Sequence, residues 1–257
     1  MQEDEEEYLI RKIKEYPQQR WKQLANRRLQ LWGELRLRNS PRGHLLICVP
    51  SAGGELTSKN VLIAQPMPSC VDTYPDIINR LKDTGIFTRS PHGKPNHVIM
   101  NEYLPGQGIM PHEDGPAYFP VVATLSLGSH SVFHYYRYKP DVEGAQLERT
   151  EGRSIDPAPV LTVLLEPRSV VISERALYST HLHAIREIEE DLITAGNAAA
   201  PPMLADLGVP VANWDRVTGA DTIRVMSEGG ALKRATRYSL TCRDVEKVAQ
   251  LKAFMKR

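Results

Sequence analysis

A few residues of the chain have the types and the spacing of metal ligands. His112 and Asp114 are separated by one residue, so on an extended strand an imidazole and a carboxylate leave the same face and can converge on one cation. His181 and His183 follow at the same spacing, and alternation alone does not say which of them faces a shared site. Two histidines and one carboxylate on one face of a metal leave its other positions open, which is the arrangement of non-haem Fe(II) oxygenases.

Polar side chains precede this stretch in a strand-like pattern. Ile99, Asn101 and Tyr103 alternate along one face of an expected strand, which ends at the turn residues Pro105 and Gly106. Two hydrogen-bonding side chains are therefore expected to point in the same direction as the metal ligands.

The segment 236–243, T-R-Y-S-L-T-C-R, alternates in the same way. Arg237, Ser239, Thr241 and Arg243 share one face, and apolar residues share the other. A polar face on a strand that is expected to be buried indicates that the interior of the fold holds a site and is not a purely apolar core. The two arginines lie about 20 Å apart on a regular strand, at about 3.3 Å per residue, so we expect them to have separate roles.

The motifs that carry these residues resemble a known enzyme family. The stretch N-E-Y-L-P-G-Q-G-I-M-P-H-E-D-G-P (101–116), followed by T-L-S-L-G-S (124–129), is similar to the AlkB family of Fe(II)/2-oxoglutarate dioxygenases. The resemblance covers most of the chain and implies Fe(II), 2-oxoglutarate and O2 as cofactors. Further matches follow in the expected order at L-Q-L-W-G (29–33), L-L-E-P-R-S (164–169), L-H-A-I (182–185) and T-R-Y-S-L-T-C-R (236–243).

The resemblance also implies roles for single residues. The distal histidine of the family precedes a small and an apolar residue, which matches His183, so it completes the iron ligands with His112 and Asp114. Arg237 is expected on the distal carboxylate of 2-oxoglutarate, because a guanidinium pairs bidentately with a carboxylate. Arg243 is expected toward the metal end, and no side-chain nucleophile is expected. The residues expected to bind the co-substrate are Asn101, Tyr103, Arg237, Arg243 and Ser239, the last standing where the family often has Asn.

The rest of the chain reads as the elements that hold these residues in place. The composition, 41% hydrophobic over 257 residues, permits a single domain with a large core. Short strand-like runs behind N-terminal helices predict a mainly β fold with flanking helices, a double-stranded β-helix or cupin-like jelly roll. Residues 1–95 are expected to hold helices and a substrate lid, 96–185 and 236–244 the jelly-roll core, and 186–235 an insertion with at most a short strand at 222–226. The predicted helices are 3–15 and 73–85, and the predicted strands after the metal motif are 121–127, 131–138, 160–165 and 169–173.

A basic segment precedes the expected barrel. Residues 11–38 contain nine Lys or Arg against two Glu, although the whole chain has a formal charge of only +1. Interleaved tryptophans would add flat stacking surfaces to phosphate-neutralising charge. A solvated basic face with core tryptophans is the alternative. The residues expected to contact nucleic acid are Arg20, Trp21, Lys22, Arg27, Arg28 and Trp32.

Composition also bounds the compartment and the partners. The three cysteines are far apart and have no C-x-x-C spacing, which favours a reducing compartment. The acidic first residues do not resemble a leader, and no apolar run approaches the length of a membrane span. We expect a monomer in cytoplasm and nucleus that acts on alkylated DNA or RNA and contacts no membrane.

These observations lead to a hypothesis of oxidative demethylation of N-alkylated DNA or RNA by an Fe(II)/2-oxoglutarate dioxygenase. A hydroxylase or demethylase of a protein or small molecule would use the same iron chemistry. It is distinguished by whether the basic segment 11–38 faces the iron. A non-catalytic reader of modified nucleic acid would have no reason to keep both the ligand set and Arg237.

Overall fold

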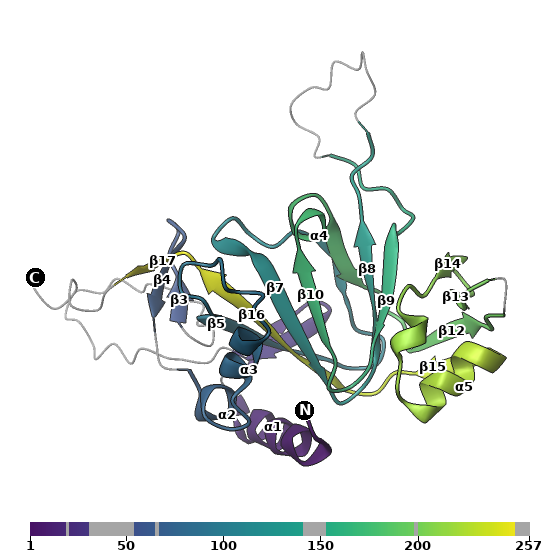
Figure 1. Cartoon of the computed structure of the whole chain (residues 1–257), viewed down its shortest axis with the longest axis horizontal. Coiled ribbons are helices and arrows are strands. Elements are labelled where there is room, and N and C mark those ends of the chain that lie inside the picture. The colour runs from purple at the N-terminus through teal and green to yellow at the C-terminus, as the bar shows by residue number, and fades with distance from the viewer. Residues whose placement is uncertain (19–20, 31–53, 65–66, 141–152, 198–199, 250–257) are drawn as a thin grey trace, which may run out of the picture.

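A computed structural model of the chain describes residues 1–18, 21–30, 54–64, 67–140, 153–197 and 200–249. Within these ranges the chain is mainly β, and two antiparallel sheets lie against each other as a double-stranded β-helix (Figure 1). This confirms the fold class expected from the sequence. No helix among the described residues is long and apolar enough to cross a membrane.

The larger sheet supplies one wall of the barrel. Its central strands are rich in β-branched and aromatic residues, as in H-V-I-M-N-E-Y and Y-F-P-V-V-A-T-L-S-L, which suit a pleated, buried surface. The strand order is β1-β2-β5-β16-β7-β10. The strands are β1 (Trp21–Leu24), β2 (Arg27–Gln30), β5 (His97–Tyr103), β16 (Arg237–Val245), β7 (Tyr118–Leu127) and β10 (Val170–Glu174).

The smaller sheet supplies the opposite wall, in the order β6-β11-β8-β9. The four strands predicted after the metal motif are confirmed, with ends that differ by a few residues. Two of them, β7 and β10, belong to the larger sheet, and the other two, β8 and β9, belong to the smaller sheet. The strands of the smaller sheet are β6 (Ile109–His112), β11 (Leu182–Ile185), β8 (Ser131–Tyr136) and β9 (Leu161–Leu165).

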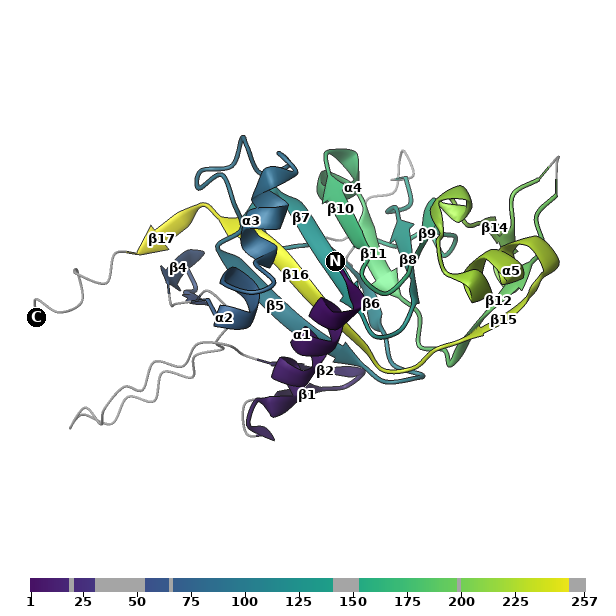
Figure 2. The ribbon, with the colours of Figure 1, turned by 60° about the horizontal axis from the view of Figure 1, so that its bottom comes forward.

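Three helices cover the outer face of the larger sheet (Figure 2). The helix predicted over 3–15 is confirmed as α1 (Glu3–Glu15), whose apolar stripe buries Leu9 and Ile13 completely. The helix predicted over 73–85 is wrong in its first half. The chain forms α2 (Ser69–Asp72), then the cis peptide Tyr74–Pro75, and α3 (Ile77–Asp83) begins only after it, capped by Asp76.

These helices and the outward face of β16 make one core. Tyr238, Leu240 and Cys242 pack beneath the helices together with Phe87 and the apolar residues of α1. The polar residues of β16 alternate with them and face the barrel interior. A short sheet, β3 (Gly54–Leu56), β4 (Val61–Ala64) and β17 (Lys247–Ala249), and a helical turn, α4 (Ala176–Ser179), complete this part of the molecule.

The predicted insertion folds into a layer of its own at one end of the molecule (Figure 1). Its four strands pair in the order β14-β13-β12-β15, and the strand expected at 222–226 is wrong because these residues lie in a helix. Buried Val225 and Met226 pack this helix on the sheet, and Val132 and Leu164 extend the same cluster into the barrel. The elements are β12 (Glu190–Thr194), β13 (Met203–Leu204), β14 (Val209–Pro210), η2 (Trp214–Arg216), α5 (Ala220–Glu228) and β15 (Gly230–Lys233).

Side chains join this layer to β9 and to the turn that follows it. Asn213 Nδ2 donates to the Leu164 carbonyl at 2.8 Å, and the Leu164 N–H donates to Asn213 Oδ1 at 2.8 Å, so the amide pairs with the strand as a backbone would. Glu166 accepts from the N–H groups of Thr218 and Gly219 at 2.8 and 2.9 Å. It caps the first turn of α5, where Gly219 has no side chain to do so.

Candidate active site

A cavity of about 240 Å³ between the two sheets brings the metal-ligand and co-substrate candidates together. The larger sheet contributes Asn101, Tyr103 and the four polar residues of β16, and the smaller sheet contributes His112 and His183. Asp114 lies on the connection after β6 and lines the same cavity. Residues from five parts of the chain therefore converge, in the way that the alternation of β5 and β16 predicts.

The register of the strands arranges the polar residues in rows. Arg237 lies opposite Tyr103, and Ser239 lies between Asn101 on one side and Ser126 on the other. Farther along the strand, Arg243 lies opposite His97. Arg237 and Arg243 thus occupy the two ends of the cavity wall.

The three metal-ligand candidates lie at the end near Arg243. His112 and His183 are direct partners across β6 and β11, and their ring centroids are 4.2 Å apart. Asp114 Oδ2 lies 4.0 Å from His183 Nε2. Ligand atoms at about 2.1 Å from a shared cation and at right angles lie about 3 Å apart. The described residues hold no set of three ligands already at coordination distance, so these groups would have to move closer together to hold one cation.

The electrostatics of these groups suit a divalent cation. Burial lowers the pKa of His183 to about 3, with His112 adding to the effect. Burial likewise lowers the pKa of His112, although the Met110 carbonyl opposes the shift. Both rings are therefore neutral, and only a neutral imidazole has a lone pair for a metal. His112 Nδ1 lies 2.9 Å from the Met110 carbonyl, which accepts its N–H and leaves Nε2 for the cation.

Asp114 is held as an anion. Burial raises the pKa of its carboxyl, but the charge of Arg243 and the hydrogen bond that Arg243 donates outweigh that effect, and the pKa is lowered. Arg243 Nη2 donates to Asp114 Oδ1, which leaves Oδ2 turned toward His183. Arg243 also lies over the ring of Tyr118, with 4.9 Å between the guanidinium carbon and the ring centroid. The structure thus places Arg243 at the metal end of the cavity.

Arg237 at the other end has the features of a carboxylate site. It is 2% exposed, and among the described residues its Nε and Nη1 have no hydrogen-bond partner. Nη2 donates to Ser126 Oγ at 2.8 Å, and the guanidinium lies over the ring of Tyr103 at 5.4 Å. Burial raises the pKa of the Tyr103 hydroxyl, which therefore stays protonated as a donor. A buried cation with free N–H groups beside a hydroxyl fits a carboxylate ligand.

The hairpin of β1 and β2 joins the larger sheet at this cavity. Leu29 lies opposite Asn101 in the β2–β5 pairing, and Arg27 and Leu29 both line the cavity. Arg27 Nε donates to Asn101 Oδ1 at 3.2 Å. Cross-strand pairing puts Lys22, opposite Leu29, on the same face of the hairpin, where it is exposed.

Other residues of the basic segment point elsewhere. Arg28 pairs with Glu102, whose side chain is buried, and stacks on Trp21 with 4.0 Å between guanidinium carbon and ring centroid. Alternation turns both side chains away from the cavity, and their contact with nucleic acid stays a prediction. Arg20 and Trp32 lie outside the described residues.

The other histidines lie outside the cavity. His181 precedes β11 and does not line the cavity, and its Nε2 accepts from Arg137 Nε at 2.9 Å. His130 pairs with Asp191 at 3.1 Å, and His134 contacts Thr162 at 3.1 Å. Neither matches a motif, and both hold the barrel and its neighbours together.

The sequence analysis missed several residues that lie next to the two buried arginines. Ser126, which accepts a hydrogen bond from Arg237, lies in the quoted motif T-L-S-L-G-S, and Tyr118 is the first residue of β7. Alternation along β5 would also have placed His97 on the cavity side, two residues before Ile99. His97 is 1% exposed and its ring lies 5.7 Å from that of Tyr118. These residues support the arginines and could have been found from the pattern alone.

The chain is similar to known proteins over nearly its whole length. A model of the 2OG-Fe(II) oxygenase superfamily matches residues 1–243. A zebrafish (Danio rerio) protein called "Probable RNA/DNA demethylase ALKBH6" is 33% identical over 254 residues, which are 98% of this chain and 86% of that protein. The quoted motifs predict that the chain resembles the sixth mammalian AlkB homologue. The name of this relative, ALKBH6, denotes the same member of the family, so the prediction is confirmed.

Two further matches cover a smaller part of the chain or superpose on it less well. A protein of Acanthamoeba polyphaga mimivirus, "Uncharacterized protein L905", is 38% identical over 77 residues, which are 29% of this chain and 35% of that protein. The solved structure of OsALKBH1 is 15% identical and covers 94% of this chain and 92% of its own. Its TM-score of 0.45 is too low to support an argument from the superposition.

Proposed function

The chain belongs to the 2OG-Fe(II) oxygenase superfamily as an enzyme of the AlkB type, and from this premise we propose that it removes methyl groups from the nitrogen atoms of nucleic-acid bases. Fe(II), 2-oxoglutarate and O2 are its cofactors. The observation that carries the substrate proposal is the position of Arg27 and Lys22, two cations on the cavity side of the β1–β2 hairpin. The name of the zebrafish relative supports it.

The residues present fit the cofactors. His112, Asp114 and His183 would hold iron, because two neutral imidazoles and one carboxylate converge there. Arg237 and Tyr103 would hold the distal carboxylate of 2-oxoglutarate. When bound, iron and 2-oxoglutarate supply the oxidation of a C–H bond by O2, and 2-oxoglutarate leaves as succinate and carbon dioxide.

The chain's own part is binding, orientation and exclusion of water. A hydrogen bond to a charged group contributes about 1.5–3 kcal/mol, or tenfold or more in affinity. Arg243 keeps Asp114 ionised and oriented, which a metal ligand requires. When the oxidised carbon is an N-methyl group, hydroxylation gives an N-hydroxymethyl product. As its hydroxyl proton is lost and the C=O bond of formaldehyde forms, its C–N bond breaks and the nitrogen keeps the electron pair of that bond.

Arg27 connects the substrate side of the cavity with the co-substrate side. It belongs to the hairpin, yet it donates to Asn101, which we expect to contact 2-oxoglutarate. The hairpin turn is anchored next to the cavity, because the Gly108 N–H donates to the Asn26 carbonyl at 3.2 Å. Only glycine fits position 108, since a Cβ there would lie 2.2 Å from the Ile185 carbonyl oxygen. A base that enters the cavity must leave its stack or come from a single strand.

The test of this function is succinate formation with Fe(II) across a panel of single-stranded oligonucleotides, each with one N-methylated base, and matched methylated peptides. We expect one or more oligonucleotides to raise the rate and to yield one formaldehyde per succinate. A methylated peptide that does so while every oligonucleotide is inert would make the enzyme a protein hydroxylase or demethylase instead.

A second experiment tests the hairpin surface itself. Phosphate contacts release counterions, so binding of a single strand should weaken with salt at a log–log slope of about −0.7 per contact. The double variant Lys22→Gln, Arg27→Gln should flatten this slope by the equivalent of two contacts. Lys82→Gln is the matched control, because Lys82 is exposed on α3 behind the larger sheet. An unchanged slope in the double variant would remove these residues from the interface.

A further inference from the structure

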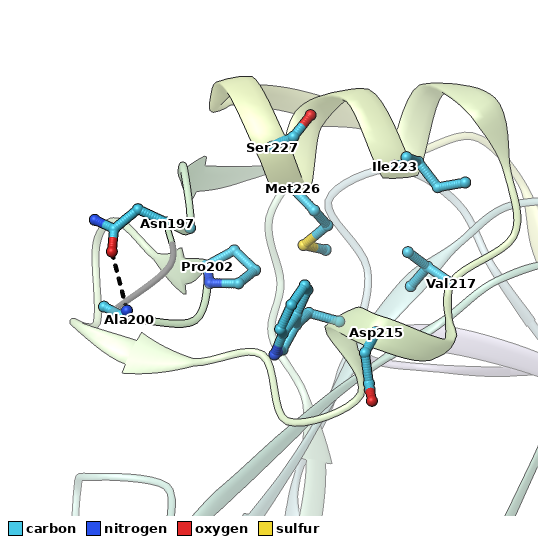
Figure 3. A pocket seen from close by; sticks show the side chains of 10 residues that line it. Asn197, Ala200, Pro202, Asp215, Val217, Ile223, Met226 and Ser227 are labelled. Carbon is cyan, nitrogen blue, oxygen red and sulfur yellow. Dashed lines mark hydrogen bonds between the residues drawn. The ribbon is translucent and has the colours of Figure 1, made fainter.

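A second cavity lies in the layer formed by residues 190–233, and it shares no residue with the iron cavity (Figure 3). Its volume is about 530 Å³, against about 240 Å³ for the iron cavity. Ile223 and Met226 of α5 form one side, Val217 lies next to Ile223, and Pro202 lies beside Met226. Trp214 also lines the cavity. This size lies within the range of about 300–1,000 Å³ that is usual for ligand sites.

Hydrogen bonds to the barrel and within the layer hold the walls of this cavity in place. Asn213, the residue before η2, is paired with the main chain of Leu164 in the barrel. Glu166 caps the start of α5 through the Gly219 N–H, and the Gly196 N–H donates to the Met226 carbonyl at 3.0 Å. The cavity is therefore formed before anything binds, which spares an occupant the free energy of ordering it.

Large apolar side chains remain in solvent at its mouth. Trp214 is 45% exposed and Ile223 is 49% exposed, although Met226, which lines the same cavity, is buried. An indole and a branched aliphatic chain at the rim of an apolar hollow are suited to a segment that enters the hollow and also lies across its edge.

The charge at the cavity defines its occupant further. Asp215 is the only charged residue among those that line it. This side chain is exposed, and within the described part of the chain no hydrogen bond or ion pair involves it. Asp221, in the first turn of α5, is already paired with Arg224 at 3.3 Å. An occupant that brings a cation to Asp215 would therefore meet an acid with no competing partner.

We propose that this cavity binds a short peptide segment of a partner protein, with an aromatic or long aliphatic side chain next to a lysine or arginine. The apolar side chain enters between Trp214 and Met226, and the neighbouring cation pairs with Asp215. The proposal is independent of the substrate of the iron site.

Three capped tetrapeptides test the chemistry directly: Ac-Ala-Phe-Lys-Ala-NH2, Ac-Ala-Phe-Glu-Ala-NH2 and Ac-Ala-Ala-Lys-Ala-NH2. Binding is followed on full-length protein with ¹³C-labelled methionine methyl groups, and the Met226 signal is assigned from Met226→Leu. We expect the Phe-Lys peptide to shift this signal with a Kd of about 1 mM, the scale of one buried side chain and one exposed ion pair together. The Phe-Glu peptide should bind about fivefold more weakly, as an exposed ion pair allows. The Ala-Lys peptide should not bind measurably.

Variants locate the site and separate it from the iron chemistry. Asp215→Asn should abolish the preference for Lys over Glu, and Trp214→Ala should abolish binding. Ile223→Ser is a second probe in case Trp214→Ala unfolds, since Ile223 is half exposed. Leu192→Ser is the matched control, because Leu192 is 44% exposed but does not line the cavity. Succinate formation should be unchanged in all four.

Each contrary result has a defined meaning. Equal binding of the Lys and Glu peptides would overturn the role of Asp215 and with it the proposal. Phenethylamine binding as tightly as the Phe-Lys peptide would make the cavity a small-molecule site. A concentration-dependent dimer that Trp214→Ala abolishes would make the occupant a second copy of this chain.

Discussion

Replacing Arg237 with methionine should stabilise the metal-free protein while it removes the response to 2-oxoglutarate. The guanidinium is almost fully buried, and two of its N–H-bearing atoms have no partner among the described residues. A buried charge without an anion costs free energy, which only the bound co-substrate offsets. Methionine has a similar length and no charge, so it fills the same space without that cost.

The magnitude follows from the electrostatics of the site. Burial lowers the pKa of Arg237 to about 10, against a usual value of about 12.5, and each pKa unit corresponds to about 1.4 kcal/mol. The folded protein therefore carries a cost of about 3 kcal/mol below pH 10, where the side chain is charged in both folded and unfolded states. For a chain of this size, each kcal/mol recovered raises the Tm by about 2–4 °C.

Arg243→Met on the same strand is the matched comparison. Arg243 is also buried, but it donates to Asp114, and removing it leaves an uncompensated carboxylate in the interior. Breaking a buried pair from one side costs about 3–5 kcal/mol. Two arginine-to-methionine changes on one strand should therefore move the Tm of metal-free protein in opposite directions.

The assay is thermal unfolding with and without 2-oxoglutarate, with Mn(II) in place of iron so that no turnover occurs. Wild type at a hundredfold excess over Kd should gain about 2.7 kcal/mol of stability, and Arg237→Met should gain almost none. A lower Tm for metal-free Arg237→Met than for wild type, or a normal response of this variant to 2-oxoglutarate, would refute the reasoning that the buried guanidinium is unpaired until the co-substrate binds.

Three further outcomes are expected. Metal content, measured by atomic emission after loading with Fe(II), should collapse in His183→Ala and survive in His181→Ala, and the reverse would exchange their roles. Arg28→Met should lower the free energy of urea unfolding by about 3–5 kcal/mol, because it strands a buried glutamate; a loss below about 1 kcal/mol would show that this pair is solvated. Burial lowers the pKa of His97 to about 3 and of His134 to about 4. The unfolded chain binds more protons below about pH 6.5, so stability should fall with acid by up to about 1.4 kcal/mol per pH unit for each, and urea titrations of His97→Phe between pH 7 and 5 should show a smaller slope than wild type.

Local periodicity carried the prediction of the barrel wall. Alternation along the last strand put Arg237 and Arg243 on the inner face, and the strand has that face inward. The same rule could not choose between His181 and His183, because residues two apart on a strand are expected on the same face. In the structure β11 begins only after His181, at the turn that follows α4. That choice came from the family motif.

Contacts between distant segments explain what the sequence analysis did not predict. Arg28 reads as a free basic residue until β2 pairs with β5 and brings Glu102 next to it. The helix α5 has few signals of its own, since its cap is Glu166, more than fifty residues earlier in the chain. Its apolar stripe packs on a sheet that exists only once β12 and β15 meet.

The pairing of Asn213 with Leu164 has a consequence for solubility. β9 is the outermost strand of the smaller sheet, and a bare strand edge offers its N–H and carbonyl groups to any other extended chain. Here an amide side chain occupies the Leu164 groups, and the Ala212 N–H occupies the Thr162 carbonyl at 2.8 Å. The layer built from residues 190–233 thus covers the edge of β9 and prevents it from pairing with a strand of another molecule. A shortened chain that joined β12 directly to β15 would lose this cover and precipitate, even with every iron ligand in place.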